Sequence, residues 1–329
     1  QQSGSITIDY EYDPLYRLNE ANYSTGGYYH YTYDSVGNRK SQDTMISGLL
    51  TNTAYDYDDA NRLVDVNGVT YTWDANGNLL SDGTNTYSYD FANRLTSFNG
   101  TSSYAYNGLG DRLSQTVNGD TTNYTLDLNA GLTQVLNDGT NSYLYGNGRI
   151  AQTAGATTDY FLGDALGSVR QLTDAQGEIT LANAYDLYGT LAQSAGGAQT
   201  SYGFTGEFTD PSGMVYLRAR YYMPNDGRFL TRDTWMGDET QPMSYNLWNY
   251  VQSNPVNYAD PSGYVRTNVN CDQISFALQE MRRLCIKANG DADNPSERYA
   301  VLSARQKFFN EIAGMSISAS GVFGEGYWW

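Results

Sequence analysis

Residues 31–39 read YTYDSVGNR, and variants of this stretch recur along the first half of the chain. Each full copy has an aromatic residue, an intervening residue, a second aromatic residue and an acidic or amide residue, followed by a turn. Successive copies begin 16 to 24 residues apart. Self-similarity with such a period is typical of a repeat protein. The copies are Tyr10-Glu-Tyr-Asp13, Tyr31-Thr-Tyr-Asp34, Tyr55-Asp-Tyr-Asp58, Tyr71-Thr-Trp-Asp74, Tyr87-Ser-Tyr-Asp90 and Tyr104-Ala-Tyr-Asn107, with weaker copies at Tyr124-Thr-Leu-Asp127 and Tyr143-Leu-Tyr-Gly146.

Each copy predicts a β-hairpin, because two short alternating stretches flank a turn that contains Gly, Asn or Asp. The two aromatic side chains lie two residues apart, so they face the same side of a strand and the residue between them faces the other side. An arginine four residues after the aspartate can return to that carboxylate or stack on a neighbouring ring. The sequence therefore predicts an all-β fold, a repetitive antiparallel β-spiral over residues 6–200.

A single hairpin cannot bury its own apolar face, so the copies must stack on one another. The ends of such a stack present unpaired strand edges, which are templates for pairing with other chains. The first strand, Ile6-Thr-Ile-Asp-Tyr10, contains nothing that protects its edge. We therefore expect neighbouring copies, or a further part of the same spiral, to cover the open edges.

A second informative stretch, residues 202–264, contains the segments YLRARYYMP, GRFLTRD and NPVNYADPSG. Together with the repeats, these segments resemble the Rhs/YD-repeat family and its conserved core end. The resemblance implies a β-shell that this stretch plugs or closes, and a pair of aspartates that cuts the chain just beyond it. The matching residues are the aspartates Asp233 and Asp260, with Arg228 in a supporting role, and the bond between Tyr264 and Val265.

The chain departs from the family pattern at two positions, the residue after Asp233 and the residue before the bond that is cut. Thr234 stands where the family has proline, and Tyr264 stands where it has leucine, so we expect slow or incomplete cutting. The residues alone also allow an alternative in which Asp260-Pro-Ser-Gly263 is a turn and Asp233 forms an ion pair with Arg228 or Arg232. Asp210-Pro-Ser-Gly213 is a second copy of the same turn, so the motif by itself is weakly specific.

The charge of the chain limits its partners. It carries 19 Lys and Arg against 36 Asp and Glu, a formal net charge of -17, and residues 265–329 contribute none of this excess. Repulsion from phosphate groups argues against nucleic acid as a partner of the repeats. No apolar run approaches the roughly 18 residues that a membrane span requires.

We expect no cofactor and no metal. His30 is the single histidine, which excludes a histidine-based triad, and no segment follows a calcium-loop pattern. The tyrosines could bind carbohydrate at a cell surface, but their same-face spacing is already explained by a packed core. Any catalysis would therefore be a single-turnover, aspartic-type self-cleavage.

After Tyr264 the apolar period changes from two residues to about 3.6, which predicts helices within residues 270–314. Cys271 and Cys285 flank the first of these helices, roughly 20 Å apart, too far for a disulfide. The sequence thus divides into a repeat spiral (1–200), a core end (201–264) and a variable helical tail (265–329).

Two functions remain open. The resemblance implies a bacterial protein, secreted or at the cell surface, whose shell encloses a C-terminal effector and presents or releases it. The alternative is a non-enzymatic extracellular structural or adhesive subunit, whose short spiral is completed by other chains in a fibre or surface element. The core end and the unrelated tail favour the first function, whereas the small number of repeats favours the second.

Overall fold

A computed structural model of the chain describes residues 6–237, 242–264 and 266–268. Within each sheet, every strand pairs antiparallel with its neighbours in the sequence. The first sheet contains β1 (Ile8–Tyr12), β2 (Leu18–Tyr23), β3 (Tyr28–Tyr33), β4 (Arg39–Ile46), β5 (Leu49–Tyr57), β6 (Leu63–Val66) and β7 (Val69–Thr70), and β8 (Thr72–Trp73) pairs with β9 (Leu79–Ser81). The second sheet contains β10 (Tyr87–Tyr89), β11 (Leu95–Phe98), β12 (Ser102–Tyr106), β13 (Arg112–Val117) and β14 (Asp120–Asn123).

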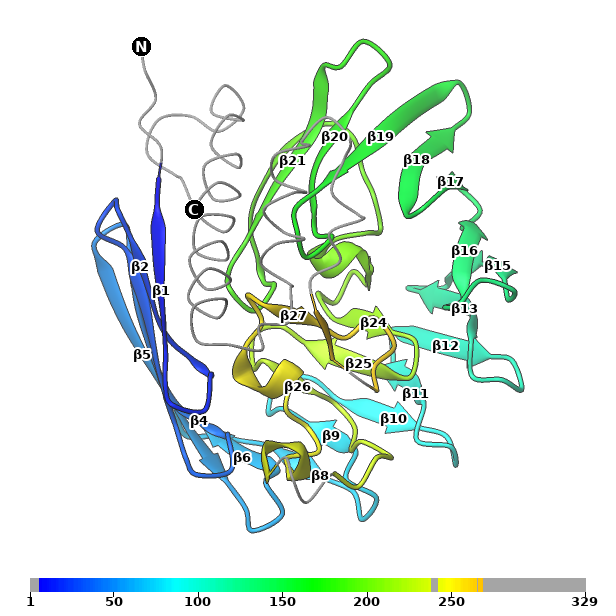
Figure 1. Cartoon of the computed structure of the whole chain (residues 1–329). Coiled ribbons are helices and arrows are strands. Elements are labelled where there is room, and N and C mark those ends of the chain that lie inside the picture. The colour runs from blue at the N-terminus through cyan, green and yellow to red at the C-terminus, as the bar shows by residue number, and fades with distance from the viewer. Residues whose placement is uncertain (1–5, 238–241, 265, 269–329) are drawn as a thin grey trace, which may run out of the picture.

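The third sheet completes the repeat region. It contains β15 (Thr125–Asp127), β16 (Gln134–Asn137), β17 (Ser142–Tyr145), β18 (Arg149–Ala154), β19 (Thr157–Gly163), β20 (Val169–Thr173), β21 (Ile179–Tyr185) and β22 (Leu191–Gly196). Figure 1 shows these strands as a curved wall that runs from blue at the left, through cyan at the bottom, to green at the right. The predicted repetitive antiparallel β architecture is therefore confirmed.

The core end forms shorter elements on the concave side of this wall (Figure 1). They are β23 (Phe208–Thr209), β24 (Val215–Leu217), β25 (Arg220–Met223), β26 (Arg228–Phe229), β27 (Tyr258–Ala259) and β28 (Thr267–Asn268), with the 3-10 turns η1 (Phe204–Gly206), η2 (Pro242–Tyr245) and η3 (Val251–Ser253). The predicted helices within 270–314, Cys271 and Cys285 lie outside the described residues.

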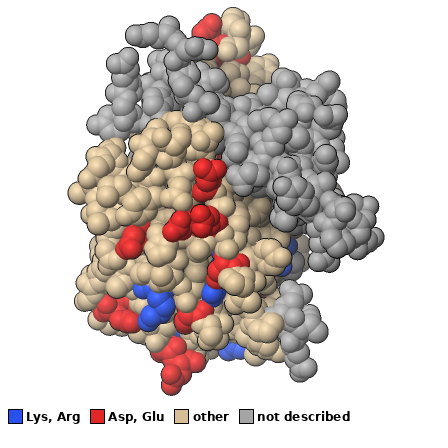
Figure 2. Space-filling model, turned by 60° about the vertical axis from the view of Figure 1, so that its left-hand side comes forward, with Lys and Arg blue, Asp and Glu red and all other residues tan. Residues whose placement is uncertain are grey.

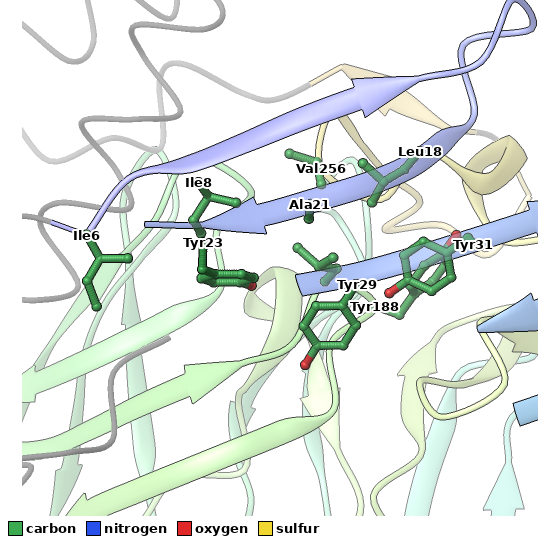
Figure 3. Packing of buried hydrophobic residues seen from close by; sticks show 10 residues of the cluster. Ile6, Ile8, Leu18, Ala21, Tyr23, Tyr29, Tyr31, Tyr188 and Val256 are labelled. Carbon is green, nitrogen blue, oxygen red and sulfur yellow. The ribbon is translucent and has the colours of Figure 1, made fainter. Parts of the chain in front are cut away.

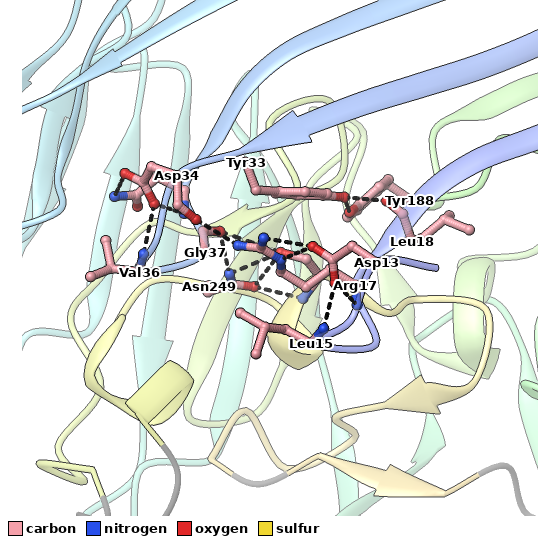
Figure 4. Close-up of polar contacts among 12 residues, drawn as sticks. Asp13, Leu15, Arg17, Leu18, Tyr33, Asp34, Val36, Gly37, Tyr188 and Asn249 are labelled. Atoms are coloured by element: carbon pink, nitrogen blue, oxygen red, sulfur yellow. Dashed lines mark hydrogen bonds and ion pairs between the residues drawn. The ribbon is translucent and has the colours of Figure 1, made fainter. Parts of the chain in front are cut away.

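The aspartate of each copy organises its turn (Figure 4). Oδ1 of Asp34 accepts hydrogen bonds from the backbone amides of Val36 at 3.0 Å and Asn38 at 2.9 Å. Asp13 caps its own turn in the same way, and its Oδ2 lies 2.5 Å from Nη2 of Arg17. The equivalent ion pairs join Asp58 to Arg62 and Asp90 to Arg94. The predicted return of the arginine to the carboxylate is confirmed.

Two of these arginines, Arg17 and Arg94, also stack on a ring of the next copy. The guanidinium carbon of Arg17 lies 4.8 Å from the ring centre of Tyr33, and that of Arg94 lies 5.0 Å from the ring centre of Tyr106. In return, the Tyr33 hydroxyl donates to the backbone carbonyl of Leu18 at 2.6 Å (Figure 4). Because both contacts join neighbouring copies, they fasten successive hairpins into a continuous wall.

The turns at the opposite edge use another backbone geometry. Asn67 and Gly68 have φ values of 51° and 85°, and Asn99 and Gly100 have values of 53° and 65°. Positive φ at both central residues defines the type I′ hairpin turn, whose twist matches that of the flanking strands. Asn-Gly supplies this conformation because both residues tolerate the left-handed region.

The first tyrosine of most copies is buried in the core, and Tyr10 and Tyr71 are half-buried against it. Tyr31 is 3% exposed, and the equivalent Tyr55, Tyr87, Tyr104 and Tyr143 are also buried. Figure 3 shows Leu18 and Tyr31 of the first two copies together with Tyr188 and Val256 from much later in the chain. The prediction that the rings form a packed core is therefore confirmed.

The residues between the core positions carry the charge. In β1, Asp9 and Glu11 are exposed, whereas Ile8 is buried and Tyr10 is half-buried. Figure 2 shows acidic side chains spread over the face that the first strands present, with a few basic side chains among them. Strand alternation thus places the acidic groups on the outer face of the wall.

Candidate functional site

The core end is attached to the turns of the wall by polar side chains that donate to backbone carbonyls. Nε1 of Trp248 donates to the carbonyl of Gly77 at 3.0 Å, and Nδ2 of Asn249 donates to that of Gly37 at 2.9 Å (Figure 4). Nδ2 of Asn254 donates to the carbonyl of Tyr16 at 2.8 Å. Three successive core-end contacts thus reach three different repeat turns, so the wall determines where the core end lies.

Asp233 and Asp260 converge on one guanidinium group. Nη2 of Arg220 lies 2.7 Å from Oδ2 of Asp233 and 3.7 Å from Oδ2 of Asp260. The side chains of these three residues are 6%, 10% and 4% exposed in the order Arg220, Asp233 and Asp260. The structure therefore brings together the two aspartates that the sequence singled out, although they lie far apart along the chain.

Arg220 is the member of this cluster that sequence reasoning missed. It begins β25, and its guanidinium carbon lies 3.6 Å from the ring centre of Phe229. Burial lowers the pKa of Arg220, and the charges of Asp233 and Asp260 act in the opposite direction. Its place in the segment YLRARYYMP was the available signal, but nothing in the spacing identified its partners.

The predicted supporting residue, Arg228, has other contacts. Its Nη2 donates to the carbonyl of Asn61 at 2.5 Å, and its Nη1 donates to Oδ1 of Asn38 at 3.1 Å. Nη2 of Arg232 contacts the sulfur of Met236 at 3.0 Å. The alternative in which Asp233 forms an ion pair with Arg228 or Arg232 is therefore corrected. Asp233 pairs with Arg220, because Arg220 at the start of β25 lies next to it and the guanidinium of Arg228 is bonded to the wall.

Asp260 also caps a turn. Its Oδ1 accepts hydrogen bonds from the backbone amide of Tyr264 at 3.1 Å and from the hydroxyl of Ser262 at 3.0 Å. This resembles the capping by Asp34 in the repeats, where Oδ1 accepts from the amide four residues later. Asp260 therefore has two carboxylate oxygens with separate partners, one in its own turn and one at Arg220.

The second Asp-Pro-Ser-Gly copy forms a different ion pair. Oδ1 of Asp210 lies 2.7 Å from Nη1 of Arg112, and both side chains are almost fully buried. Rings surround the guanidinium, with the centre of Tyr216 at 4.4 Å and that of Phe208 at 4.5 Å. The two copies of the motif thus lie in separate clusters, and Asp210 does not join Asp233.

A cavity of about 1080 Å³ lies between the wall and the core end. Its lining includes Arg149, Tyr202 and Arg218, and it reaches Pro261 within the Asp260 turn and Thr267 beyond that turn. In the part of the chain that the structure describes, no group of three or more His, Cys, Asp or Glu could hold a metal ion. The described residues also contain no helix long and apolar enough to cross a membrane.

A wall of repeated hairpins with a core end on its concave side defines a repeat-shell protein. The family model of the Teneurin YD-shell matches residues 1–256. The chain therefore belongs to this family of YD-repeat shells, and the resemblance inferred from the sequence is confirmed.

Curated relatives include nucleases and toxin components. The tRNA3(Ser)-specific nuclease WapA of Bacillus spizizenii is 31% identical over 269 residues, which is 77% of this chain and 12% of that protein. Toxin subunit YenC1 of Yersinia entomophaga is 28% identical over 121 residues, 35% of this chain and 12% of that protein. The chain thus spans about an eighth of the length of these relatives.

A solved structure shows the same fold. The crystal structure of TcdB2-TccC3-Cdc42 superimposes with a TM-score of 0.64 and 20% sequence identity, over 78% of this chain and 15% of that chain. Because the identity is low, this likeness concerns the arrangement of the strands.

Proposed function

We propose that this chain is the C-terminal portion of a secreted YD-repeat shell protein that encloses a C-terminal effector and presents it or releases it by one aspartate-dependent self-cleavage after Tyr264. The carrying observation is the convergence of Asp233 and Asp260 on Arg220, beside a turn whose next residue is Tyr264. The names of the relatives, a tRNA nuclease and a toxin subunit, support a role in toxin delivery. Release and cleavage are part of this proposal.

The proposed reaction is hydrolysis of the peptide bond between Tyr264 and Val265. One carboxylate takes a proton from a water molecule, whose oxygen attacks the carbonyl carbon of Tyr264. The other carboxyl group, in its protonated form, gives its proton to the departing amine as the C–N bond breaks. The products are a carboxyl group on Tyr264 and an amino group on Val265. Because the bond is tethered to the dyad, one slow turnover suffices.

The surroundings of Tyr264 bear on the expected rate. Its side chain is 49% exposed, so the bulk that replaces the family's leucine lies partly in solvent. The missing proline affects Thr234, which is exposed, while Oδ1 of Asp233 accepts a hydrogen bond from the amide of Trp235 at 2.8 Å. The expected slow cutting therefore rests on both changes, the lost rigidity at Thr234 and the added bulk at Tyr264.

Intact-mass measurement during prolonged incubation tests the dyad. We expect a species that ends at Tyr264 to accumulate in the parent protein and to be absent from Asp233→Asn and Asp260→Asn. Asp127→Asn is a matched control, because Asp127 caps an exposed turn through the amide of Asn129. Cutting at the parent's rate in either dyad variant would exclude the dyad, and an uncut parent would leave Asp260 as a turn cap.

A second candidate function is that of a non-enzymatic structural or adhesive subunit that assembles with other chains. It rests on the strand order, because β1 and β22 each pair with one neighbour among the described residues. Such edges accept further strands from the rest of the shell or from another copy. Light scattering on this chain at rising concentration separates the candidates: association without cutting supports the subunit, and a cut monomer supports the effector shell.

A further inference from the structure

We infer that the hairpin tip Leu217–Arg220, between β24 and β25, is a clamp that presents the bond after Tyr264 for cutting, and that Arg218 is its positioning residue. This inference rests on the proposed function. It concerns residues that contact the backbone of residues 261–264, the cleavage segment, in addition to the two carboxylates. The contacts on both sides of Tyr264 carry the argument.

Three successive residues of the tip hold three successive carbonyls of the cleavage segment. Nη1 of Arg218 donates to the carbonyl of Pro261 at 2.5 Å. The backbone amide of Ala219 donates to the carbonyl of Ser262 at 3.2 Å. Nε of Arg220 donates to the carbonyl of Gly263. The backbone leading to Tyr264 therefore has a fixed path, and Arg220 connects that path to both carboxylates.

The tip and the segment touch backbone to backbone at Gly263. This glycine has a φ of 73°, and a Cβ atom placed on it would lie 2.6 Å from the carbonyl oxygen of Leu217 and 3.0 Å from the amide nitrogen of Arg220. A glycine is therefore required by both conformation and space. The close approach leaves no room for a side chain between the segment and the tip.

Arg218 ties the clamp to the rest of the shell. Its Nη1 also lies 2.8 Å from Oε2 of Glu207, and its Nε donates to the carbonyl of Thr133 in the wall at 3.1 Å. Arg218 itself has a φ of 61°, a left-handed conformation that costs an arginine free energy and is kept by these contacts. The side chain of Arg218 thus links the cleavage segment to both the core end and the wall.

The chain beyond the bond is held as well. In the antiparallel pair of β27 and β28, Ala259 is opposite Thr267, whose Oγ1 donates to the carbonyl of Ala259 at 3.2 Å. The guanidinium carbon of Arg266 lies 4.3 Å from the ring centre of Tyr258. The described residues on both sides of the bond after Tyr264 are therefore held by other parts of the core end.

Time courses of intact mass for the parent, Arg218→Gln, Arg218→Lys and Glu207→Gln test the clamp, with the thermal midpoint of each variant measured alongside. Loss of a charge-assisted hydrogen bond to the segment is expected to slow cutting by roughly tenfold or more in Arg218→Gln. Arg218→Lys keeps a cationic donor to Pro261 and recovers most of the rate. Glu207→Gln is the matched control, because it weakens the same ion pair but retains the donor to Pro261.

Each outcome decides the clamp. Arg218→Gln cut at the parent's rate, or Glu207→Gln slowed as much as Arg218→Gln, would overturn it while leaving the dyad intact. If Arg218→Gln does not fold, Glu207→Met/Arg218→Met removes the donor without leaving a buried charge, and cutting at the parent's rate would then overturn the clamp. An uncut parent would overturn both the proposed cleavage and the clamp.

Discussion

Replacing Arg112 by methionine is expected to weaken the attachment of the core end to the wall. Arg112 begins β13 of the wall, and Asp210 belongs to the core end. Their side chains are 2% and 1% exposed, and Nη1 of Arg112 also lies 2.7 Å from the hydroxyl of Tyr221. The variant leaves the Asp210 carboxylate buried without its cation.

The expected loss in the free energy of unfolding is about 3–5 kcal/mol, because removing one partner of a buried ion pair leaves an uncompensated charge. Removing both charges avoids that penalty, so Arg112→Met/Asp210→Asn is expected to be at least about 2 kcal/mol more stable than Arg112→Met. Arg149→Met is a matched control. The guanidinium carbon of Arg149 lies 3.0 Å from the ring centre of Tyr202, and its Nη1 donates to the carbonyl of Gly206. The expected loss in the free energy of unfolding for Arg149→Met is about 1–2 kcal/mol.

Denaturant titration followed by tyrosine and tryptophan fluorescence measures all four proteins, with the slope of each transition checked against the parent. A double variant no more stable than Arg112→Met would refute the argument that the uncompensated charge of Asp210 causes the loss. A cost of Arg112→Met equal to that of Arg149→Met would refute it as well.

Gly263→Ala is expected to abolish cutting and to lower the thermal midpoint, because the new Cβ atom would lie 2.6 Å from the carbonyl oxygen of Leu217. Detection of the cut product of this variant by mass spectrometry would contradict the prediction. Gln252 has a φ of 56°, a left-handed conformation that is unfavourable for any residue with a Cβ atom. Gln252→Gly is therefore expected to raise the free energy of unfolding by about 1 kcal/mol in denaturant titration, and a lower free energy of unfolding would contradict this. Burial raises the pKa of Asp226 to about 6, above the roughly 3.9 of an unfolded chain. The contribution of Asp226 to stability is therefore fully present below about pH 4 and is lost as the pH rises through about 6. The thermal midpoint of Asp226→Asn minus that of the parent should then be more positive at pH 7 than at pH 4. Equal differences at the two pH values would contradict this.

The sequence by itself determined the elements and the local turns. Aromatic residues two apart, followed by an aspartate, specify a strand face and a capped turn within a few residues, and Asn-Gly specifies the type I′ turn at the other edge. These signals are local, and they correctly predicted the antiparallel wall, the buried first tyrosines and the return of Arg17 to Asp13. The resemblance of the core end also selected Asp233 and Asp260, which the fold brings to one place.

Only the tertiary structure decided which groups meet across the concave side of the wall. Arg220 rather than Arg228 or Arg232 pairs with Asp233, and Asp210 pairs with Arg112 although its motif matches that of Asp260. These partners come from distant hairpins, and their distances depend on the curvature accumulated over many strands and on where the core end is attached. Sequence spacing fixes the period of the wall but carries no information about that curvature, so identical turn motifs reach different partners.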